Sequence, residues 1–423
     1  MSRPRAVVLV TGSELVRGDR RDLNGPFLAG ELVRLGLEPA RITIVGDGPD
    51  ELAASLSEGL AADLLVISGG LGPTHDDRTI ELLAAAAGRE LLVDRGLEQE
   101  IESVSRLIAE RLRRPYADFA SGVRKQASLP VGAVSLGVAG TAPGVVLAAN
   151  GCVAVALPGP PSELQRLWRS ALESDQLQPV LARARPPGRR VLRFFGASES
   201  AVAHALDEAG GDGDGVEATI CARDFEIHVD LFVEPGADER ADELAAALRA
   251  TLERYLFAED ERGIEEIVLA LCRSQGLTLA AAESCTGGMV AERMTSVPGA
   301  SDVFAGSVVT YSNALKQHLL GVSAELLERH GAVSAEVAAA MASGARVHLG
   351  ADVAVAVTGI AGPDGGTPSK PVGLVYVHGA TPFAERGSEL NLPGDREQIR
   401  RRSTVAALHL LRTLLTRSRD RAV

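Results

Sequence analysis

Short aliphatic runs alternate with amphipathic segments through the first part of the chain. The runs Val7–Val10, Ile42–Val45 and Leu64–Ile67 are mostly apolar, which is typical of buried strands. Between them, Pro26–Leu37 and Glu51–Leu60 place apolar residues at helical spacing. This alternation of strand and helix predicts a parallel sheet with helices on both faces.

The middle of the chain follows a different pattern. The first unit ends near Trp168, and the segment ARPPGRR at 184–190 combines proline, glycine and charge as interdomain seams do. Beyond it, VLRFFG predicts a strand, SESAVAHALDEA a helix, VEATICA with FEIHVDLFVE a hairpin, and residues 237–256 a second helix. We expect a small α+β module that serves as a structural or dimer-forming element.

Strand–helix alternation resumes after a second seam at Phe257–Gly263. Helices are predicted at 264–275, 335–349 and 395–416, with strands at LTLAAA, AGSVVTY, VAVAVTG and GLVYVHG. The predicted fold class is therefore α/β, with two parallel-sheet α/β/α domains joined by a small α+β module. The expected boundaries are 1–170, 171–258 and 259–423, and the two outer domains should be separable by cutting the chain.

Composition narrows the class of protein. Hydrophobic residues make up 46% of the chain and charged residues 23%, a balance typical of soluble globular proteins. The net charge of −13 argues against electrostatic binding of nucleic acid. Its four cysteines are widely separated, which argues against a zinc site or a disulfide framework. The first apolar run is too short to span a membrane, so we expect a cytoplasmic enzyme without membrane contact.

Ser284 lies in ESCTGG, between a predicted strand and a predicted helix. Such a junction exposes a side chain at the carboxyl edge of a sheet, beside the free amides of the following helix. The amides around Thr286, Gly287 and Gly288 would then form an oxyanion hole for a serine nucleophile. The alternative is that Ser284 is only a helix N-cap and the glycines are ordinary turn residues.

Two more polar loops follow strands in the same domain. One contains Lys316, and a partly desolvated lysine with a lowered pKa can take the proton of a serine. Three polar, glycine-rich loops at strand ends converge as ligand sites in open α/β sheets do. The further candidate residues of these loops are Tyr311, Asn313, Thr358, Gly359 and Gly362.

The ordered motifs ESCTGG, YSNALK, GAVSAEVAAAMA and VAVTGIAGPDGGTPSKPVG, with the later Arg400, resemble the C-terminal domain of the CinA family of competence/damage-inducible proteins over residues 263–415. The resemblance implies a metal-independent amidohydrolase that converts nicotinamide mononucleotide to nicotinate mononucleotide and ammonia. It implies that Ser284 is the nucleophile and Lys316 its proton-transfer partner, with Tyr311, Thr358 and Arg400 as supporting residues. Cys285 is expected to be a buried filler, because no histidine pairs with it in sequence.

The N-terminal domain has polar loops after its first and third strands. Their glycine amides could cradle a diphosphate, and Asp76 and Asp77 suit a divalent ion that bridges its oxygens. The alternative is that both aspartates only cap the helix TIELLAAAAG. The candidate ligand contacts are Gly12, Glu14, Asn24, Gly69, Gly70, Gly72 and Thr74.

Together with GTAPG at 140–144 and LPGPPSEL, which contains Glu163, these loops resemble the molybdopterin-binding superfamily. They resemble the N-terminal domain of the CinA family more closely, over about 1–170. That resemblance implies a metal-dependent ADP-ribose pyrophosphatase that gives AMP and ribose 5-phosphate. The sequence departs from the family at Gly137 and Val138, where an Asn-Pro pair is usual, and the departure puts substrate contacts from this loop in question.

The resulting hypothesis is a bifunctional pyridine-nucleotide salvage enzyme that is a homodimer, takes small-molecule nucleotides and contacts no nucleic acid. One alternative is an N-terminal domain that binds a molybdopterin-type ligand or is inactive, with the deamidase alone functional. Another is a DNA-uptake or repair factor. The net negative charge and the lack of a basic, aromatic stripe argue against direct DNA binding.

Overall fold

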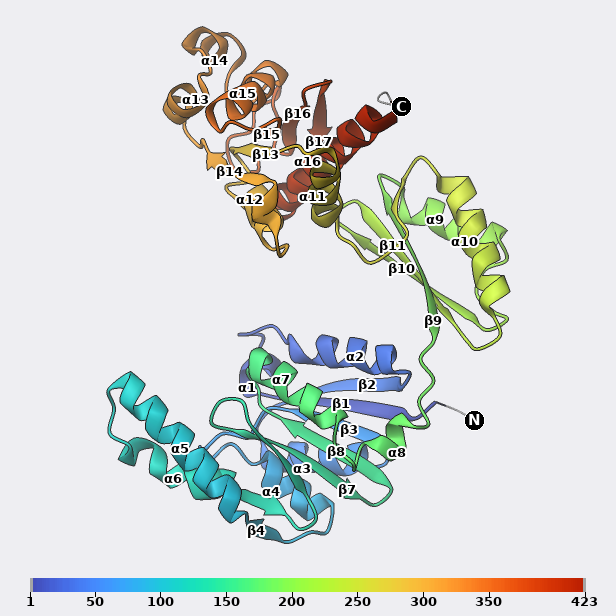
Figure 1. The fold of residues 1–423 in the computed structure, drawn as a ribbon, viewed down its shortest axis with the longest axis vertical. Coiled ribbons are helices and arrows are strands. Elements are labelled where there is room, and N and C mark those ends of the chain that lie inside the picture. The colour runs from blue at the N-terminus through green and yellow to red at the C-terminus, as the bar shows by residue number, and fades with distance from the viewer. Residues whose placement is uncertain (1–2, 421–423) are drawn as a thin grey trace. The chain divides into compact units, whose positions relative to one another are not determined.

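A computed structural model describes residues 3–420, which form two compact units that divide between Pro187 and Gly188 (Figure 1). The first unit extends beyond the expected boundary at 170. Leu177, Val180 and Ala184 pack into its core, so the segment after Trp168 belongs to it. The second unit contains both the middle module and the C-terminal α/β domain.

The first unit is built on a six-stranded sheet with the order β2-β1-β3-β8-β7-β6. Its strands are β1 (Arg5–Thr11), β2 (Glu38–Val45), β3 (Leu64–Ser68), β6 (Val134–Val138), β7 (Pro143–Ala149) and β8 (Cys152–Leu157); β4 (Leu91–Val93) and β5 (Ser128–Pro130) form a separate pair. Its helices are α1 (Ser13–Val16), α2 (Asn24–Leu35), α3 (Pro49–Gly59), α4 (Thr79–Ala86), α5 (Arg95–Leu112), α6 (Ala117–Gln126), α7 (Pro161–Leu172) and α8 (Gln178–Leu181).

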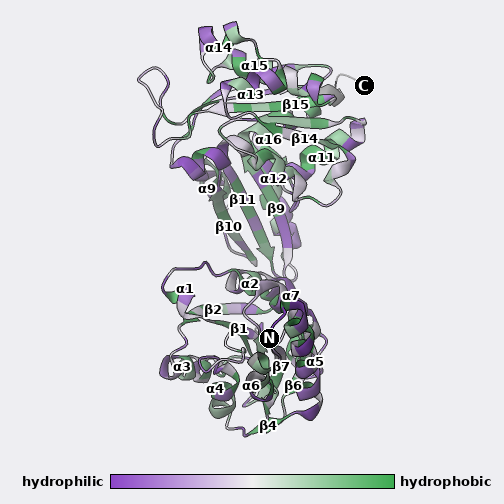
Figure 2. Ribbon diagram, turned by 90° about the vertical axis from the view of Figure 1, so that its left-hand side faces the viewer, coloured by the Kyte–Doolittle hydropathy of each residue, from purple (hydrophilic) through white to green (hydrophobic). Residues whose placement is uncertain are grey.

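Both faces of this sheet are buried, which explains the uninterrupted apolar runs. Successive side chains of β1 point to opposite faces. Leu9 packs in one core with Leu52 of α3, and Val8 packs in the other with Leu28 of α2. In Figure 2 the strands are mostly green, whereas much of the outer helix α5 is purple.

The α/β class is confirmed, but the first sheet is mixed rather than wholly parallel. β2, β1, β3 and β8 run parallel, whereas β7 and β6 are antiparallel to their neighbours. The cause is local. Asn150 and Gly151 alone connect β7 to β8, with φ of 54° and 83°, as in a type I′ hairpin turn. A two-residue turn cannot carry the crossover that parallel strands need.

The middle module is an antiparallel sheet with the order β10-β11-β9-β12, covered on one face by two helices (Figure 1). Its elements are β9 (Gly188–Phe195), α9 (Glu199–Glu208), β10 (Val216–Arg223), β11 (Glu226–Val233), α10 (Asp238–Leu252) and β12 (Leu256–Ala258). Buried aliphatic residues of both helices and the strands form one core. This agrees with the predicted α+β module.

The C-terminal domain has a five-stranded sheet with the order β14-β13-β15-β16-β17. Its strands are β13 (Leu279–Glu283), β14 (Phe304–Val309), β15 (Val353–Gly359), β16 (Leu374–Ala380) and β17 (Glu385–Asn391), and its helices are α11 (Ile264–Gln275), α12 (Met289–Thr295), α13 (Asn313–Leu320), α14 (Ala324–His330), α15 (Ala335–His348) and α16 (Arg396–Asp420). β14, β13 and β15 are parallel, but β16 and β17 are antiparallel, so this sheet is mixed too. Over the described residues, no helix is long and apolar enough to cross a membrane.

Candidate active sites

Ser284 follows β13 directly and lies at the edge where β13 and β15 end. Its amide donates to the carbonyl of Val357, which continues the pairing of the two parallel strands. The side chain is 9% exposed. Ser284 therefore lies at the carboxyl edge of the sheet, as predicted.

Lys316 reaches Ser284 from α13, which Ser312 caps at its N-terminus. The Lys316 Nζ lies 3.0 Å from the Ser284 Oγ and donates to the Thr310 carbonyl at 2.7 Å. The residue is 1% exposed, and burial lowers the pKa of its ammonium group below the ordinary value. Both contacts are neutral oxygens, and in the described chain no carboxylate forms an ion pair with this amine. The neutral amine that a general base requires is therefore easier to reach than in an exposed lysine.

Glu283 is a site residue that the sequence analysis missed. Its carboxylate is fully buried and accepts hydrogen bonds from the amides of Gly288, Val290 and Ala291 at 2.8 to 3.1 Å. The Ser307 hydroxyl adds a fourth bond at 2.9 Å. Glu283 thus caps α12 and fixes the turn that carries Ser284.

This capped turn removes two of the three amides predicted for the oxyanion hole. The Gly288 amide is bound by Glu283, and the Gly287 amide donates to the Ser284 carbonyl at 3.2 Å. Thr286 is fully buried beneath the turn. Gly287 and Gly288 have φ of 59° and 101°, a left-handed conformation that favours glycine. Glycine is therefore needed at 287 and 288 to form the turn, and the amides of these two residues are not left free to bind a substrate.

Two arginines of α16 donate hydrogen bonds to the loops around Ser284. Arg400 donates through Nε to the Cys285 carbonyl at 3.1 Å and through Nη2 to the Thr286 carbonyl at 2.7 Å. Arg396 donates to the hydroxyl of Tyr311 at 3.0 Å and to the carbonyl of Gly362 at 2.7 Å. Arg400 is therefore a supporting residue of the Ser284 loop, and Arg396, which the sequence analysis missed, joins two of the three predicted loops.

The remaining predicted residues of this domain are more peripheral. Thr358 is buried and donates to the Ala332 carbonyl at 2.7 Å, so its hydroxyl supports the loop before α15. Asn313 is exposed at the start of α13, and Gly359 packs closely against Val375. Cys285 is buried, and burial raises the pKa of its thiol to about 12. Its thiol is thus protonated at neutral pH, which agrees with the filler role.

In the first unit, most of the predicted residues line one pocket of about 350 Å³ at the carboxyl ends of β1 and β3. The pocket wall contains the carboxylates Glu14, Asp47, Asp76, Asp77 and Glu163 and no lysine, arginine or histidine. Gly12, Gly69, Gly70 and Gly72 also line it. Asn24 does not: it is buried and donates to Ser68 and to the Gly159 carbonyl, so it braces the wall from behind.

Asp47 was not predicted, although it lines the same pocket. It accepts hydrogen bonds from the Ser13 amide and hydroxyl at 2.9 and 2.6 Å and from the Thr11 hydroxyl at 3.0 Å. Burial raises the pKa of Asp47, but these hydrogen bonds outweigh it and lower the pKa below its ordinary value. The ionised carboxylate therefore holds the loop after β1 in place.

Asp76 and Asp77 converge on Thr74, whose hydroxyl donates to Asp76 and whose amide donates to Asp77 at 2.9 Å. Helix α6 braces the same loop. Its Lys125 donates to the Thr74 carbonyl and its Gln126 to the Leu71 carbonyl at 3.0 Å. The two aspartates thus face the pocket from a loop that is fixed on both sides, and neither of them is the N-cap of α4, which is Arg78.

The donor set suits a divalent cation only in part. Hard ions such as Mg²⁺ prefer carboxylate oxygens and are commonly held by one or two carboxylates together with substrate phosphates. Within residues 3–420, no three His, Cys, Asp or Glu side chains converge closely enough to bind a metal by themselves. Asp76 and Asp77 therefore fit the mode in which a bound substrate completes the coordination.

Three family descriptions match successive parts of the chain. Residues 7–182 match "Probable molybdopterin binding domain", residues 189–258 "Damage-inducible protein CinA KH domain", and residues 261–415 "CinA C-terminal domain". A CinA-like protein of Mycolicibacterium gilvum is 46% identical over 97% of this chain and 99% of its own. A CinA-like protein of Mycobacterium tuberculosis is 43% identical over 97% of both chains. The chain belongs to the CinA family.

Solved structures of CinA proteins match parts of the chain. The competence/damage inducible protein CihA from Agrobacterium tumefaciens is 38% identical, with 38% of this chain and 99% of that chain covered and a TM-score of 0.35. The protein CinA with unknown function from Thermoplasma acidophilum is 32% identical, with 41% of this chain and 98% of that chain covered and a TM-score of 0.35.

The middle module of this CinA chain carries a loop with the spacing that KH domains use. KH domains clamp nucleotides with a GxxG loop, and residues 210–213 read GGDG. Asp212 and Asp214, however, put negative charge in and beside this loop. The nearby Arg240 donates to the carbonyls of Ala209 and Gly211, so its guanidinium is engaged in holding the loop. The loop therefore lacks the free positive charge that nucleic-acid binding requires.

The departure from the usual CinA sequence at Gly137 and Val138 lies in β6. Gly137 has φ of 74°, and the pairing of β6 with β7 is irregular between Ser135 and Val138. Neither Gly137 nor Val138 lines the pocket of the first unit, whereas Thr141 and Ala142 of GTAPG do. The replacement thus alters an irregular strand and leaves the pocket wall itself intact.

Proposed function

We propose that the second unit hydrolyses the carboxamide of nicotinamide mononucleotide to nicotinate mononucleotide and ammonia. One observation carries this proposal: the buried amine of Lys316 lies 3.0 Å from the Ser284 hydroxyl, and no carboxylate of residues 3–420 forms an ion pair with it. Membership of the CinA family and the motif resemblance supply the substrate. A serine–lysine pair of this kind performs acyl transfer on amides and esters.

The reaction then proceeds in two halves. Neutral Lys316 takes the Ser284 proton as Oγ attacks the carboxamide carbon, and the ammonium formed returns that proton to the departing nitrogen, so ammonia leaves and an ester remains. Water attacks the ester with Lys316 as base again, which releases nicotinate mononucleotide and restores the serine. Glu283 and Arg400 hold the Ser284 turn so that the nucleophile stays beside Lys316.

Product analysis tests this proposal directly. The purified chain is incubated with nicotinamide mononucleotide, and the products are identified by mass together with an ammonia assay. Ser284→Ala should abolish ammonia release without unfolding the protein. Ser274→Ala removes an exposed hydroxyl of α11 that bonds only to the Leu271 carbonyl, and should leave the rate unchanged. Near-normal deamidation by Ser284→Ala would refute the nucleophile assignment.

We propose further that the pocket of the first unit hydrolyses ADP-ribose to AMP and ribose 5-phosphate with a divalent metal. The supporting observation is electrostatic: five carboxylates and no basic side chain line the pocket. These carboxylates repel a diphosphate, so a cation has to offset the negative charge before a diphosphate can bind in the pocket. Asp76 and Asp77 would hold the ion, which would polarise the diphosphate and offset its charge.

The residues of this chain also suggest a proton donor. Glu163 lines the same pocket, and burial raises the pKa of its carboxyl group. A raised pKa makes a carboxyl group a better proton carrier than an ordinary, exposed carboxylate. Glu163 would therefore protonate the leaving phosphate or accept a proton from the attacking water.

The matching family description also keeps a molybdopterin-type ligand as a second candidate for this pocket. Turnover of ADP-ribose that requires metal and stops with a chelator would support the pyrophosphatase. Binding of a molybdopterin-type ligand, measured by calorimetry on a chain that fails to cleave ADP-ribose at any metal concentration, would favour the alternative.

A further inference from the structure

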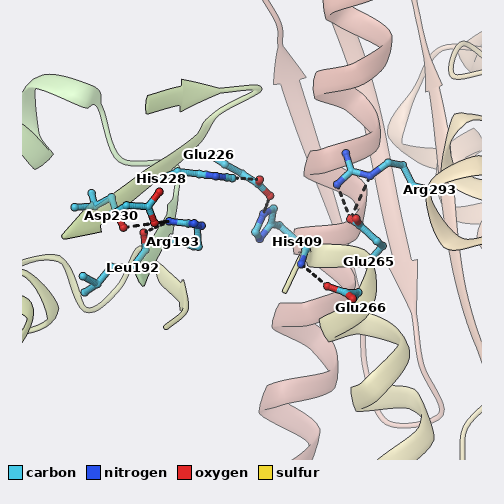
Figure 3. A network of polar contacts seen from close by, with 11 residues as sticks. Leu192, Arg193, Glu226, His228, Asp230, Glu265, Glu266, Arg293 and His409 are labelled. Atoms are coloured by element: carbon cyan, nitrogen blue, oxygen red, sulfur yellow. Dashed lines mark hydrogen bonds and ion pairs between the residues drawn. The ribbon is translucent and has the colours of Figure 1, made fainter. Parts of the chain in front are cut away.

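A buried polar contact connects the middle module to the C-terminal domain within the second unit. Glu226, the first residue of β11, accepts a hydrogen bond through Oε1 from the Nε2 of His409 on α16 at 2.8 Å (Figure 3). The side chains are 11% and 2% exposed. The other oxygen, Oε2, lies 3.3 Å from the Nε2 of His228. The two domains therefore meet at a contact that excludes solvent.

The imidazole of His409 is also clamped by aromatic rings of the module. Phe195 of β9 stacks on it with ring centroids 3.7 Å apart and planes 8° apart. Phe257 of β12 meets it edge to face with centroids 4.6 Å apart. Glu226 and Phe195 are direct partners in the β11–β9 pairing, so one point of the sheet supplies both the hydrogen bond and the stack. The ring is thus fixed in position and in orientation.

Helix α16 extends from this contact to the Ser284 loop. Arg400, whose guanidinium holds the carbonyls of Cys285 and Thr286, precedes His409 by nine residues, or about 13 Å of helix. The helix packs on the C-terminal core through apolar side chains such as Ile399, Ala407 and Leu411. Apolar packing is non-directional, so it resists separation better than it resists sliding or rotation about the helix axis. The hydrogen bonds of Arg396 and Arg400 resist such motion near the start of the helix. The hydrogen bond and the ring stack at His409 resist it nine residues beyond Arg400.

We propose that Glu226 and His409 are positioning residues for the Ser284 site, which act by fixing the register of α16 and hence of Arg400. The inference rests on the proposed deamidation at Ser284 and extends it to the module. A buried polar or ionic contact is weak evidence for stability, and its best-attested use is to specify one arrangement among several. The middle module is on this reading a part of the deamidase site rather than a linker.

The test compares substitutions that break the contact with matched substitutions elsewhere. Glu226→Leu removes the acceptor, His409→Phe keeps the ring stack but loses the N–H, and Glu226→Gln keeps an acceptor oxygen. Glu208 and His204 on α9 provide the control, because they form a glutamate–histidine pair with side chains 63% and 73% exposed. Glu208→Leu and His204→Phe should leave the protein unaffected.

Two readouts separate positioning from stability. For nicotinamide mononucleotide, Glu226→Leu and His409→Phe should lower kcat roughly tenfold with KM little changed, since small misplacement of reacting groups costs rate. Glu226→Gln should restore most of that loss. Hydrogen–deuterium exchange at the Gly288, Val290 and Ala291 amides, which Glu283 protects, should speed up in the same two variants and stay slow in the controls.

The outcomes are distinct. If both variants fold and match the controls in kcat and in exchange, the proposal is wrong. If Glu226→Leu and His409→Phe lower kcat independently, so that their effects multiply in the double variant, the two residues do not act as one contact and the proposal also fails. If the wild type does not deamidate nicotinamide mononucleotide, the proposed function fails, while the exchange of the loop amides still decides whether Glu226 positions it.

Discussion

Lys316 is the residue whose environment most constrains the chemistry of the second unit. Transferring a charged ammonium group into a site without a counter-ion is costly, and a buried lysine commonly becomes neutral instead. The two hydrogen-bond partners of the Lys316 amine, Ser284 Oγ and the Thr310 carbonyl, are both neutral. The amine can therefore accept the serine proton at a pH where an exposed lysine could not.

This predicts a pH profile. Because burial lowers the pKa of Lys316, kcat/KM for deamidation should rise with pH through that lowered pKa and level off above it, well before the ordinary value for lysine. If the chemical step did not use Lys316, this rise of kcat/KM with pH should be absent. A rate that follows the ordinary pKa of an exposed lysine would contradict the prediction.

Substitution gives the complementary measurement. Lys316→Met should lower the rate by about 10²-fold or more, as expected for a lost general base. Lys316→Arg should be equally impaired, because the guanidinium stays protonated. If Lys316→Arg retained most of the activity, Lys316 would act through its charge rather than as a base.

At this scale the sequence indicated the proposed serine–lysine pair and the supporting Arg400, but not Glu283 or Asp47. Ser284 and Lys316 stand in polar loops after strands, and that position is readable from hydrophobic patterning. Glu283 and Asp47 were missed because each acts as an acceptor for backbone and hydroxyl donors that only the folded loops bring to it. A carboxylate next to a strand end carries no local mark of that role.

The loop before helix α4 carries the two aspartates of the proposed metal-dependent hydrolysis. Replacing Asp76 and Asp77 together by Asn keeps their shape and removes their charge. Metal-dependent ADP-ribose hydrolysis should fall by about 10²-fold or more, with little change in Tm, because both side chains face the pocket rather than the core.

Asp94 offers a control for the capping alternative. It caps α5 by accepting a hydrogen bond from the Leu97 amide at 3.0 Å, and it does not line the pocket. Asp94→Asn should leave both activity and Tm nearly unchanged. A large drop in Tm for the Asp76/Asp77 variant, at unchanged specific activity, would instead assign those residues a structural role.

The contact between β11 and α16 predicts an acid-sensitive second unit. Burial lowers the pKa of His409 to about 4, opposed by Glu226, with Arg412 and Arg293 adding to the decrease. As the pH is lowered, His409 is protonated in the unfolded state before it is protonated in the folded state. Its contribution to the free energy of unfolding is therefore fully present above about pH 6.5 and is lost as the pH falls towards 4. The shift corresponds to roughly 3 kcal/mol.

Thermal melts from pH 7 to pH 4 measure this effect. His409→Gln retains a donor in place of the imidazole N–H but does not titrate, so its Tm should fall less steeply than that of the wild type over this range. Glu226, whose pKa is held to about 2 by hydrogen bonds from His228 and His409 that outweigh its burial, stays ionised throughout. If Tm fell with pH equally in His409→Gln and in the wild type, the acid sensitivity could not be assigned to His409.

Element types were more predictable than strand direction. Helical spacing correctly indicated α2, α3, α11 and α15, and apolar runs indicated the central strands of both sheets. The Asn150–Gly151 pair is a strong hairpin signal that the strand–helix alternation concealed. β17 was missed because most of its residues are exposed on both faces of the strand. Its sequence, ERGSELN, therefore has no alternation of apolar and polar residues to detect.

At the scale of the whole molecule, the two chemistries should separate at the junction of Pro187 and Gly188. A fragment of residues 1–187 should retain ADP-ribose cleavage and lose it to a chelator. A fragment of residues 188–423 should deamidate nicotinamide mononucleotide at the rate of the full chain without added metal. The sequence suggested fragments from Met1 to about Trp168 and from about Glu261 to Val423 instead, because each set of motifs lies within one of these stretches. A contact such as that of Glu226 with His409 leaves no trace in a linear pattern.

The shorter fragment, residues 261–423, distinguishes the two boundaries. It lacks Phe195, Glu226 and Phe257, so His409 loses its partners. Its kcat should be lower than that of the 188–423 fragment by roughly tenfold. Equal kcat values for the two fragments would show that the C-terminal domain needs no support from the module.

The distribution of thiols has a consequence for how copies of the chain become linked in air. Cys152, Cys272 and Cys285 are buried, and burial raises the pKa of each thiol to about 12, so oxidants meet almost no thiolate there. Cys221, on β10, is exposed. A chain with one accessible thiol can crosslink once and then stop, so aged protein should show a single band of doubled mass on a non-reducing gel, absent from Cys221→Ser. Light scattering of the expected homodimer therefore has to be done under reductant, where only non-covalent association survives.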